Sequence, residues 1–430
     1  MLRNCLRKHK NDSAENLYDL LVVEGKIAEL APAGALTPPR EAAVYDAGGR
    51  QLFPSFIDAH VHLRDPGFEY KEDMQSGLCA AVHGGFGAVM AMANTNPVND
   101  KGAVTGFIRE KAARICPRGP RVYPVGALSV GLMGEELAPM GELAEAGAVA
   151  ISNDGRPVQN NELFRRAVEY AASFGLKVID HCEDADIAHN WQINEGGGSL
   201  HTGLKGQPSV GEAVQVARDI LFAEYLNLPI HLAHISCRQS TDLIRWAKVR
   251  GVPVTAETCP HYLLLDDAKL HSYNTNFKVS PPLRTSADVA ALVQAVQDGT
   301  IDILVTDHAP HAAYEKDTPF DESPRGFIGL ETAVPLTSAL FSAELLEELW
   351  CKKPAEIFKL PRNNFAPGDP ADFFLFDLET PWVVNRDNIH SKSLNSPWLG
   401  QTMQGKIVAH WLGGTQIFSC EDSLCLPKPL

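Results

Sequence analysis

The segment Asp58-Ala59-His60-Val61-His62-Leu63-Arg64-Asp65 follows a short apolar run, which we interpret as a buried strand. Residues two apart on an extended strand point to the same side, so His60 and His62 present two imidazoles together. Paired imidazoles suit a borderline metal ion such as zinc. Arg64 continues the same side with a planar cation suited to a carboxylate. A His-x-His pair alone is more often a surface or hydrogen-bonded core feature, so the other strand ends decide whether a metal site is present.

Apolar runs recur along the middle of the chain, each followed by a polar turn and a stretch of helical character. They are continuous rather than alternating, which is typical of parallel strands covered on both faces. Ser209 and Glu212 predict a capping box at the start of one helix. Eight βα units over this length predict a TIM (β/α)8 barrel, an α/β fold. The runs span 52–57, 87–92, 122–125, 148–151, 177–179, 230–233, 252–256 and 301–305, and the helical stretches include 161–174, 210–225, 240–250 and 287–298.

The two ends of the chain do not fit the barrel, because further β-rich segments precede and follow the βα units. Gly413-Gly414 predicts a hairpin turn, and Pro367-Gly368-Asp369-Pro370 predicts a boundary. We therefore expect a small β domain, built from residues 1–53 and 366–430, beside a catalytic barrel of residues 54–365. The β-rich segments span 18–31, with a turn at Glu24-Gly25, and 372–377, 405–411 and 415–418.

Polar side chains gather where the predicted strands end, and the chemistry of a TIM barrel collects at that end of its strands. Charged groups at the end of a buried strand are costly when unpaired. A metal centre therefore explains histidines and aspartates that converge on one mouth better than packing does. Glu257 and His261, after the seventh strand, are interpreted as orienting or packing groups. The ligand-type residues at the strand ends are His60, His62, Asp154, His181, His234 and Asp307, and Asn94 is a further polar residue at the end of the second strand.

The ligand set suits two borderline ions held close together, with His60 and His62 on the first ion, His181 and His234 on the second, and Asp154 between them. Asp307 completes the first site or lies beside it, and it can also act as general base and acid toward a leaving nitrogen. Two such ions can generate a nucleophile at neutral pH and polarise a carbonyl. Occupancy by one ion or by two stays open, and the ligand count favours two.

Composition limits the partners of the protein. A formal net charge of −15 over 430 residues argues against nucleic acid or an anionic membrane. No apolar run approaches the roughly 20 residues of a membrane span. Residues 1–10 are polar and basic, so we expect no secretory signal. The nine cysteines occur singly, without a Cys-x-x-Cys pair, as expected of reduced thiols in the cytoplasm.

The strand-end residues and their neighbours resemble the cyclic amidohydrolase superfamily and, within it, the class I dihydroorotases. The similarity runs from about residue 18 to residue 418, nearly the whole chain. Many members of the superfamily bridge their metals with a carboxylated lysine, whereas Asp154 stands at the corresponding strand end here. This difference favours the aspartate-bridged dihydroorotases over hydantoinases and allantoinases. The matching segments span 58–67, 93–97, 181–184, 233–236, 281–284, 306–311 and 326–332.

The resemblance implies reversible cyclisation of N-carbamoyl-L-aspartate to L-dihydroorotate in pyrimidine biosynthesis, with Asp307 as catalytic acid and base. Ser280 stands where these enzymes often place Asn, and its hydroxyl can bond to the substrate ring with a shorter reach. The zinc ligands that the resemblance implies are His60, His62, Asp154, His181, His234 and Asp307. The implied substrate contacts are Arg64 and Asn94 on the carboxylate, with His311, and Ser280 and Gly326.

Two other functions stay open. A related cyclic amidase would act on hydantoin, allantoin or dihydropyrimidine rings, which lack the carboxylate that Arg64 and Asn94 fit. A non-catalytic homologue that scaffolds a carbamoyltransferase is disfavoured by the complete ligand set. We expect a homo-oligomer, and association with an aspartate carbamoyltransferase stays open.

The remaining polar groups near the strand ends have simpler interpretations. His308 directly follows Asp307 and should point elsewhere, so we interpret it as structural. Glu183 is a second carboxylate, besides Glu257, that could orient a metal-bound histidine. The polar loop 311–326 is either a mobile rim over the site or a solvated loop.

Overall fold

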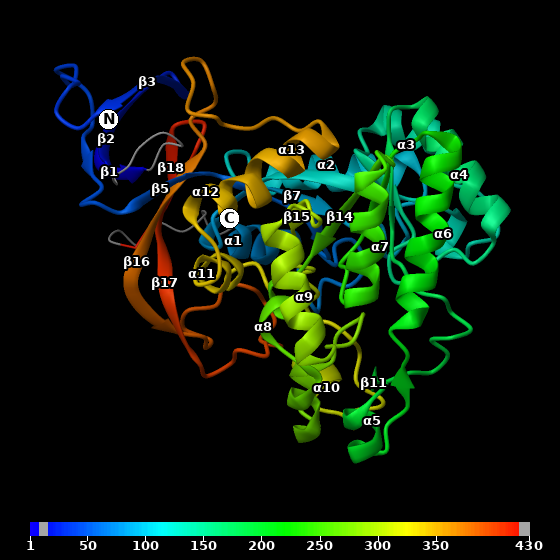
Figure 1. Ribbon diagram of the computed structural model, residues 1–430. Coiled ribbons are helices and arrows are strands. Elements are labelled where there is room, and N and C mark those ends of the chain that lie inside the picture. Colours follow the sequence, from blue (N-terminus) through cyan, green and yellow to red (C-terminus); the bar gives the residue numbers. More distant parts are fainter. Residues whose placement is uncertain (8–15, 421–430) are drawn as a thin grey trace.

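A β barrel surrounded by helices lies beside a β sheet that both ends of the chain build (Figure 1). The computed structural model describes residues 1–7 and 16–420. The parts of the predicted small β domain that fall on residues 8–15 and 421–430 lie outside the described residues. No helix in the described ranges is long and apolar enough to cross a membrane.

Eight parallel strands form the barrel sheet, which confirms the predicted TIM barrel. Helices cover its outer face, so both faces of the central strands are buried and the strands are continuously apolar. The strands, in their hydrogen-bonded order, are β6 (Phe56–Val61), β7 (Phe86–Ala91), β8 (Arg121–Ala127), β9 (Ala150–Ser152), β10 (Lys177–Asp180), β13 (Ile230–Leu232), β14 (Val254–Thr258) and β15 (Ile303–Leu304).

Side-chain and loop hydrogen bonds join the two end strands of this order, β6 and β15. The Asp58 carboxylate on β6 accepts hydrogen bonds from the backbone N–H of Thr306, at 3.1 Å, and from its hydroxyl. The backbone N–H of His62 donates to the carbonyl of His308 at 2.8 Å. Burial raises the pKa of Asp58 to about 7, although these hydrogen bonds oppose the shift. The first residue of the quoted segment thus ties the first barrel strand to the last.

The first apolar run is not a single strand, and this part of the prediction is wrong. β5 (Gln51–Pro54) belongs to the small sheet, and β6 of the barrel begins at Phe56. Both strands are buried, so the apolar run continues across the boundary between two sheets. As a consequence, His60 lies within β6 rather than after its end.

Helices connect the barrel strands, and the four predicted from periodicity are present with ends shifted by at most two residues. The last helical stretch continues from α12 through the π-helical turn η4 to α13, and η4 packs against β6 and β15. The helices are α1 (Met74–His83), α2 (Gly102–Ile115), α3 (Met140–Ala146), α4 (Asn161–Ser173), α5 (Gly197–Thr202), α6 (Val210–Leu226), α7 (Arg238–Val249), α8 (Pro260–Leu264), α9 (Ser286–Gln297), α10 (Ala313–Lys316), α11 (Ala333–Ser338), α12 (Ala343–Glu347) and α13 (Lys353–Phe358). The 3₁₀ segments are η1 (Val130–Leu132), η2 (Asp267–Ser272) and η3 (Thr275–Phe277), and the π-helical turn is η4 (Glu348–Lys352).

The capping box predicted at Ser209 and Glu212 is wrong. Ser209 has helical backbone angles, and its hydroxyl donates to the side chain of Gln239 at 3.1 Å. Glu212 is buried and accepts hydrogen bonds from the backbone N–H groups of Ser236 and Cys237 at 3.1 and 3.2 Å. The Glu212 carboxylate therefore binds the loop after β13 and does not cap its own helix in the way that the local pattern predicts.

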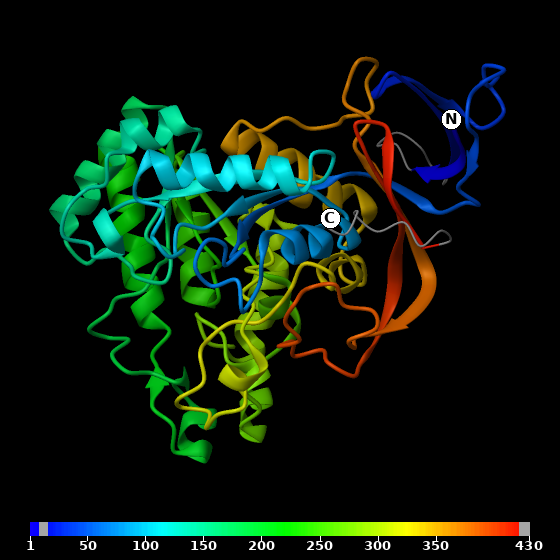
Figure 2. The same ribbon diagram turned by 180° about the vertical axis from the view of Figure 1, so that it is seen from behind.

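The small sheet joins the N- and C-terminal segments, because β5 pairs with β16 in antiparallel orientation. The predicted turns at Glu24-Gly25 and Gly413-Gly414 connect β2 to β3 and β17 to β18. The sheet twists beside the barrel (Figure 2). Its order is β18 (Thr415–Ser419), β17 (Thr402–Leu412), β16 (Phe373–Val383), β5, β1 (Leu2–Arg7), β2 (Asn16–Val23) and β3 (Lys26–Pro32), with β4 (Tyr45–Asp46) also paired to β1; a further small sheet holds β11 (Ile193–Asn194) and β12 (Gly206–Gln207).

The chain leaves the small sheet between β16 and β17 and returns after residues 384–401, which we call the strap. Two backbone hydrogen bonds close its base, from Val384 to the Gln401 carbonyl at 3.0 Å and from Gly400 to the Val384 carbonyl at 2.8 Å. The strap extends from the sheet toward the barrel (Figure 1, orange-red). It brings residues of the C-terminal region to the loops at the barrel mouth.

Candidate active site

A cavity of about 240 Å³ lies at the carboxyl ends of the barrel strands. Its polar lining comes from segments that follow seven different strands, as expected of a TIM-barrel site. Predicted and unpredicted residues line it together: His62, Arg64, Asn94, Asp154, Gly155, His181, His234, Ser280, Asp307, Ala309, Arg325 and Gly326.

Sharp turns directly after the strands aim several of these side chains into the cavity. Arg64, His234 and Asp307 have φ values of 61°, 30° and 48°. These are left-handed backbone conformations that residues with side chains rarely adopt. Each follows its barrel strand by two or three residues, so the chain accepts local strain at the point where a strand end must present a polar group.

Histidine nitrogens converge on two carboxylates. Asp154 Oδ1 lies 3.5 Å from His60 Nε2, 3.4 Å from His181 Nδ1 and 3.3 Å from His234 Nε2. Asp307 Oδ1 lies 3.1 Å from His62 Nε2 and 3.7 Å from His60 Nε2. Two groups of metal-ligand type result, one of His60, Asp154 and His234 and one of His60, His62 and Asp307. The structure thus gathers all six predicted ligands around one point.

The hydrogen bonds of these histidines leave ring nitrogens available to bind a cation. Glu257 accepts a hydrogen bond from His60 Nδ1 at 2.7 Å, so Nε2 is the ring nitrogen of His60 that faces the carboxylates and could bind a cation. That nitrogen is buried and has no hydrogen-bond partner in residues 1–7 and 16–420. His181 Nδ1 and His234 Nε2 are only 2.9 Å apart, so a proton or a metal ion must separate their lone pairs. The donor set therefore fits bound metal.

The electrostatics agree with this interpretation. Burial alone would lower the pKa of His60, but Asp154 and Glu257 raise it well above its ordinary value. Burial would raise the pKa of Asp154, but His60, His181 and His234 hold it well below its usual range. The cluster therefore attracts positive charge strongly. Imidazole and carboxylate groups are suited to bind a divalent metal ion, which would supply that charge.

Comparison with known proteins places the chain in a family. The family model of dihydro-orotase-like proteins matches residues 49–240. A dihydroorotase of Pelobacter propionicus is 47% identical over 408 residues, covering 93% of this chain and 95% of that protein. A dihydroorotase of Geotalea daltonii is 48% identical over 402 residues, covering 92% and 94%. The chain belongs to the dihydroorotase family. It is accordingly an enzyme, a cyclic amide hydrolase, as the strand-end residues predict.

Solved structures of related fold support the barrel architecture of this dihydroorotase family member. The L-hydantoinase of Arthrobacter aurescens superposes with a TM-score of 0.84 at 22% identity, covering 97% of this chain and 95% of that one. A dihydropyrimidinase from Brevibacillus agri gives a TM-score of 0.81 at 20% identity, covering 97% and 94%. At such identities the similarity establishes the fold and leaves the substrate open.

Second partners orient the histidines on the side of β6. Glu257 holds His60 through Nδ1 and accepts a further hydrogen bond from His231 Nε2 at 2.9 Å. His62 Nδ1 lies 2.8 Å from Asn94 Oδ1, so Asn94 orients a histidine as well as lining the cavity. His261 instead packs its ring against Phe327, and burial lowers its pKa to about 3.

If the cluster binds a metal ion, Glu257→Gln is expected to weaken the affinity for added zinc about 10- to 100-fold, because partners of metal-bound histidines contribute that much to affinity. The amide can donate to His60 and so favours the wrong tautomer of the ring. Competition with a chromophoric chelator measures the affinity. Glu224→Gln, at a partly exposed residue on α6 paired with Arg250, is the control and should leave zinc affinity unchanged. Equal affinities in the two variants would contradict the role of Glu257.

The predicted substrate side of the cavity is built around Arg64. Its Nε donates to the Pro310 carbonyl at 3.2 Å, and its Nη2 lies 3.5 Å from His311 Nε2. His311 is buried, and burial together with Arg64 and nearby lysines lowers its pKa, so the ring is neutral. Its Nε2 is 2.9 Å from the Arg325 carbonyl, to which it donates. His311 therefore touches Arg64 and its loop rather than the array of ligand atoms.

Sequence reasoning missed Arg325, which lines the cavity directly before the predicted Gly326. Its guanidinium stacks on Trp191 at 3.8 Å, and the Trp191 indole donates to Glu183 at 3.0 Å. Glu183 therefore holds an aromatic platform at the rim, not a histidine. Adjacency to the matching segment 326–332 was the available signal. His308 points away from the cavity toward Glu72, at 3.3 Å, as its structural interpretation predicts.

Proposed function

We propose that the protein is a zinc-dependent dihydroorotase that interconverts N-carbamoyl-L-aspartate and L-dihydroorotate in de novo pyrimidine biosynthesis. One observation carries the proposal: the partly buried guanidinium of Arg64 lines the same cavity as the ligand cluster. A cyclic amide that also bears a carboxylate meets both features, whereas an uncharged ring would bring no negative charge to the guanidinium. The identity of the curated relatives supports the same substrate.

The metal would be held by His60, His62, Asp154, His181, His234 and Asp307, with two zinc ions favoured over one. Bound zinc would supply an electrophile for the ring carbonyl and would lower the pKa of water. The carboxylate of Asp154, which lies near three histidine nitrogens, would contribute a ligand to this metal centre.

Asp307 would move the proton. Burial raises the pKa of its carboxyl, but the hydrogen bond with His62 and the charge of His60 outweigh burial and hold the pKa below its usual value. The carboxylate is therefore ready to accept a proton from water as oxygen adds to the ring carbonyl. It would return that proton to the ring nitrogen as the C–N bond breaks. Ring closure runs through the same steps in reverse.

The substrate carboxylate would lie against Arg64 and the amide nitrogen of Asn94. Asn94 has its oxygen on His62, so its two N–H donors are free to face the cavity. Ser280 and Gly326 also line the cavity and would contact the ring. The guanidinium supplies both charge and planar geometry for this contact.

Cellular context follows from the same proposal. The described cysteines are all free thiols, which supports the cytoplasm as the site of action. Leu221 and Tyr225 on α6 are 60% and 78% exposed, and such apolar exposure supports a homo-oligomer. Association with an aspartate carbamoyltransferase stays a proposal that co-purification can test.

The test is a substrate panel. Purified enzyme with zinc is assayed on L-dihydroorotate, hydantoin, allantoin and dihydrouracil, with ring opening followed by ultraviolet absorbance or by release of the ureido product. We expect turnover of L-dihydroorotate to exceed that of each uncharged ring at least about 1,000-fold, since a site built around a buried polar partner rejects ligands that lack it. Preference for an uncharged ring would replace this proposal with a hydantoinase-type function.

A further inference from the structure

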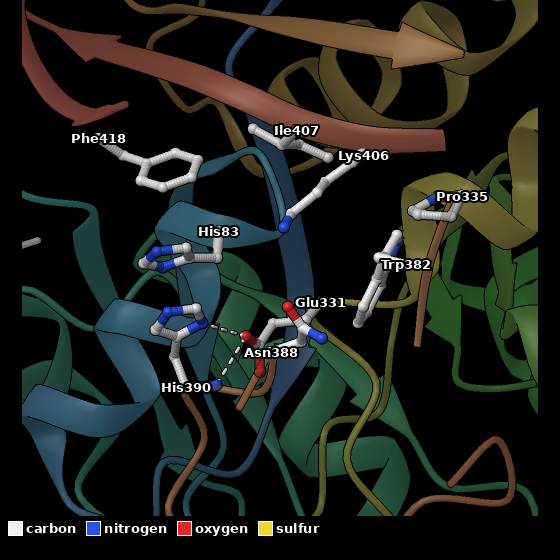
Figure 3. Close-up of a pocket in the computed structure, with 9 residues that line it drawn as sticks. All are labelled: His83, Glu331, Pro335, Trp382, Asn388, His390, Lys406, Ile407 and Phe418. Atoms are coloured by element: carbon white, nitrogen blue, oxygen red, sulfur yellow. Dashed lines mark hydrogen bonds and ion pairs between the residues drawn. The ribbon is translucent and has the colours of Figure 1, made fainter. Parts of the chain in front are cut away.

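Two buried carboxylates clamp the middle of the strap to the barrel. Glu331, within the matching segment 326–332, accepts hydrogen bonds from the backbone N–H of His390 at 2.8 Å and of Ser391 at 3.2 Å. Figure 3 shows Glu331 bound to both the backbone nitrogen and the ring of His390. Glu72 accepts from the Ser391 hydroxyl and from the backbone N–H of Lys392. This part of the C-terminal region is therefore fixed on the barrel.

Beyond the clamp, Asn395 reaches two loops of the active site. Its Oδ1 accepts a hydrogen bond from the backbone N–H of His311 at 3.1 Å. Its Nδ2 donates to the carbonyls of Ala309 at 3.2 Å and Gly326 at 3.1 Å. Its own carbonyl accepts from Ile328 at 2.9 Å. The side chain is buried at 4% exposure, so these bonds hold its position without competition from water.

The two loops that Asn395 joins form the substrate side of the cavity. Ala309 and Gly326 line the cavity, and a Cβ at Gly326 would lie 2.6 Å from the Ala309 Cβ. The Pro310 carbonyl, between two residues bound by Asn395, accepts the hydrogen bond from Arg64 Nε. A chain of contacts thus leads from the strap to the guanidinium.

We infer that Asn395 is a positioning residue for recognition of the substrate carboxylate, and that the strap makes the C-terminal region part of the active site. Asn395 acts through the backbone of residues 309–311, which sets the place of the Arg64 guanidinium. The inference rests on the proposed function, because it concerns the carboxylate that distinguishes the substrate. It deepens that function by assigning part of the selectivity to a residue outside the barrel.

Truncation should affect binding more than chemistry. Asn395→Ala leaves the His311 N–H and two carbonyls buried without their partner, and such groups are costly unless the loops move. Movement of these loops would displace Arg64, which donates to the Pro310 carbonyl. Asn395 forms no hydrogen bond with any of the six ligand residues among the described residues. KM for L-dihydroorotate should rise about 10-fold and kcat should stay within about twofold of wild type. Metal content should be unchanged.

The experiment compares wild type, Asn395→Ala and the matched control Asn388→Ala in steady-state kinetics with zinc present. Asn388 lies on the same strap, where its amide donates to the Val383 carbonyl, and its variant should keep the wild-type KM. If Asn395→Ala does not fold, Asn395→Ser is measured with the same expectation. An unchanged KM in folded Asn395 variant, or a loss confined to thermal stability and kcat, would overturn the inference.

Hydrogen exchange separates this inference from the proposed function. Peptides containing residues 309–311 and 326–328 should exchange faster in the Asn395 variant than in wild type, whatever the substrate. If wild type fails to turn over L-dihydroorotate, the proposed function is wrong while faster exchange still supports the positioning of the loops. Unchanged exchange in both peptides would refute the positioning role even in an active enzyme.

Discussion

Asp307→Asn lowers kcat for L-dihydroorotate about 1,000-fold in the expected result, since general acid–base catalysis contributes on this scale. The amide cannot accept the proton from water or return it to the ring nitrogen. It also loses the negative charge that lies 3.1 Å from His62 Nε2. Steady-state kinetics at saturating zinc measure the change, and metal analysis of the same sample shows how much of the loss reflects weaker metal binding.

Asp242→Asn is the matched control for Asp307. Asp242 lies on α7, is well exposed and pairs with Arg245, so its variant should keep wild-type kcat. An Asp307→Asn enzyme that retains metal and more than about a tenth of wild-type kcat would show that another group moves the proton, because a group acting as the acid and base contributes at least about 100-fold.

Arg64→Ala is expected to reduce kcat/KM for L-dihydroorotate about 1,000-fold, because bound substrate would cover this charge pair and truncation of one partner of a covered pair costs several kcal/mol. The loss should appear mainly in KM, since the guanidinium binds a carboxylate that does not react. Activity on an uncharged ring should fall far less, so the ratio of the two activities is the informative quantity. Steady-state kinetics on L-dihydroorotate and on hydantoin provide that ratio.

Arg245→Ala serves as the control, because this partly exposed arginine forms ion pairs on the outer surface. Its kinetics should match wild type on both substrates. An Arg64→Ala enzyme with unchanged kcat/KM for L-dihydroorotate would contradict the carboxylate role and would make the hydantoinase-type alternative the better account.

The barrel could be predicted from sequence because its signals are local. Each parallel strand is a continuous apolar run, and ligand-type residues such as Asp154 and His181 follow their strands directly. A residue that directly follows a barrel strand in the sequence is therefore expected to lie at the mouth that all the strands share. The same signal predicts one strand where the structure has two, β5 and β6. Both strands are buried and only Ser55 separates them, so the hydrophobic pattern shows no break.

Features that depend on distant segments could not be read in this way. Asn395 meets His311 across 84 residues of chain, in a strap with no periodic pattern of its own. Glu212 binds the turn at Ser236 instead of capping its helix, because tertiary hydrogen bonds override the local preference. Arg325 lines the cavity only because loop 311–326 folds back to the mouth. Such contacts are properties of the assembled fold.

The central claim, that metal held by these six residues drives turnover of dihydroorotate, can be tested in one measurement. Hydrolysis of L-dihydroorotate is followed by ultraviolet absorbance with the enzyme as isolated, after complete chelation and after zinc is returned, with bound zinc counted in each sample. We predict loss of turnover on chelation and recovery with one or two zinc ions per chain. Unchanged turnover in metal-free protein, or no turnover despite bound zinc, would contradict the claim.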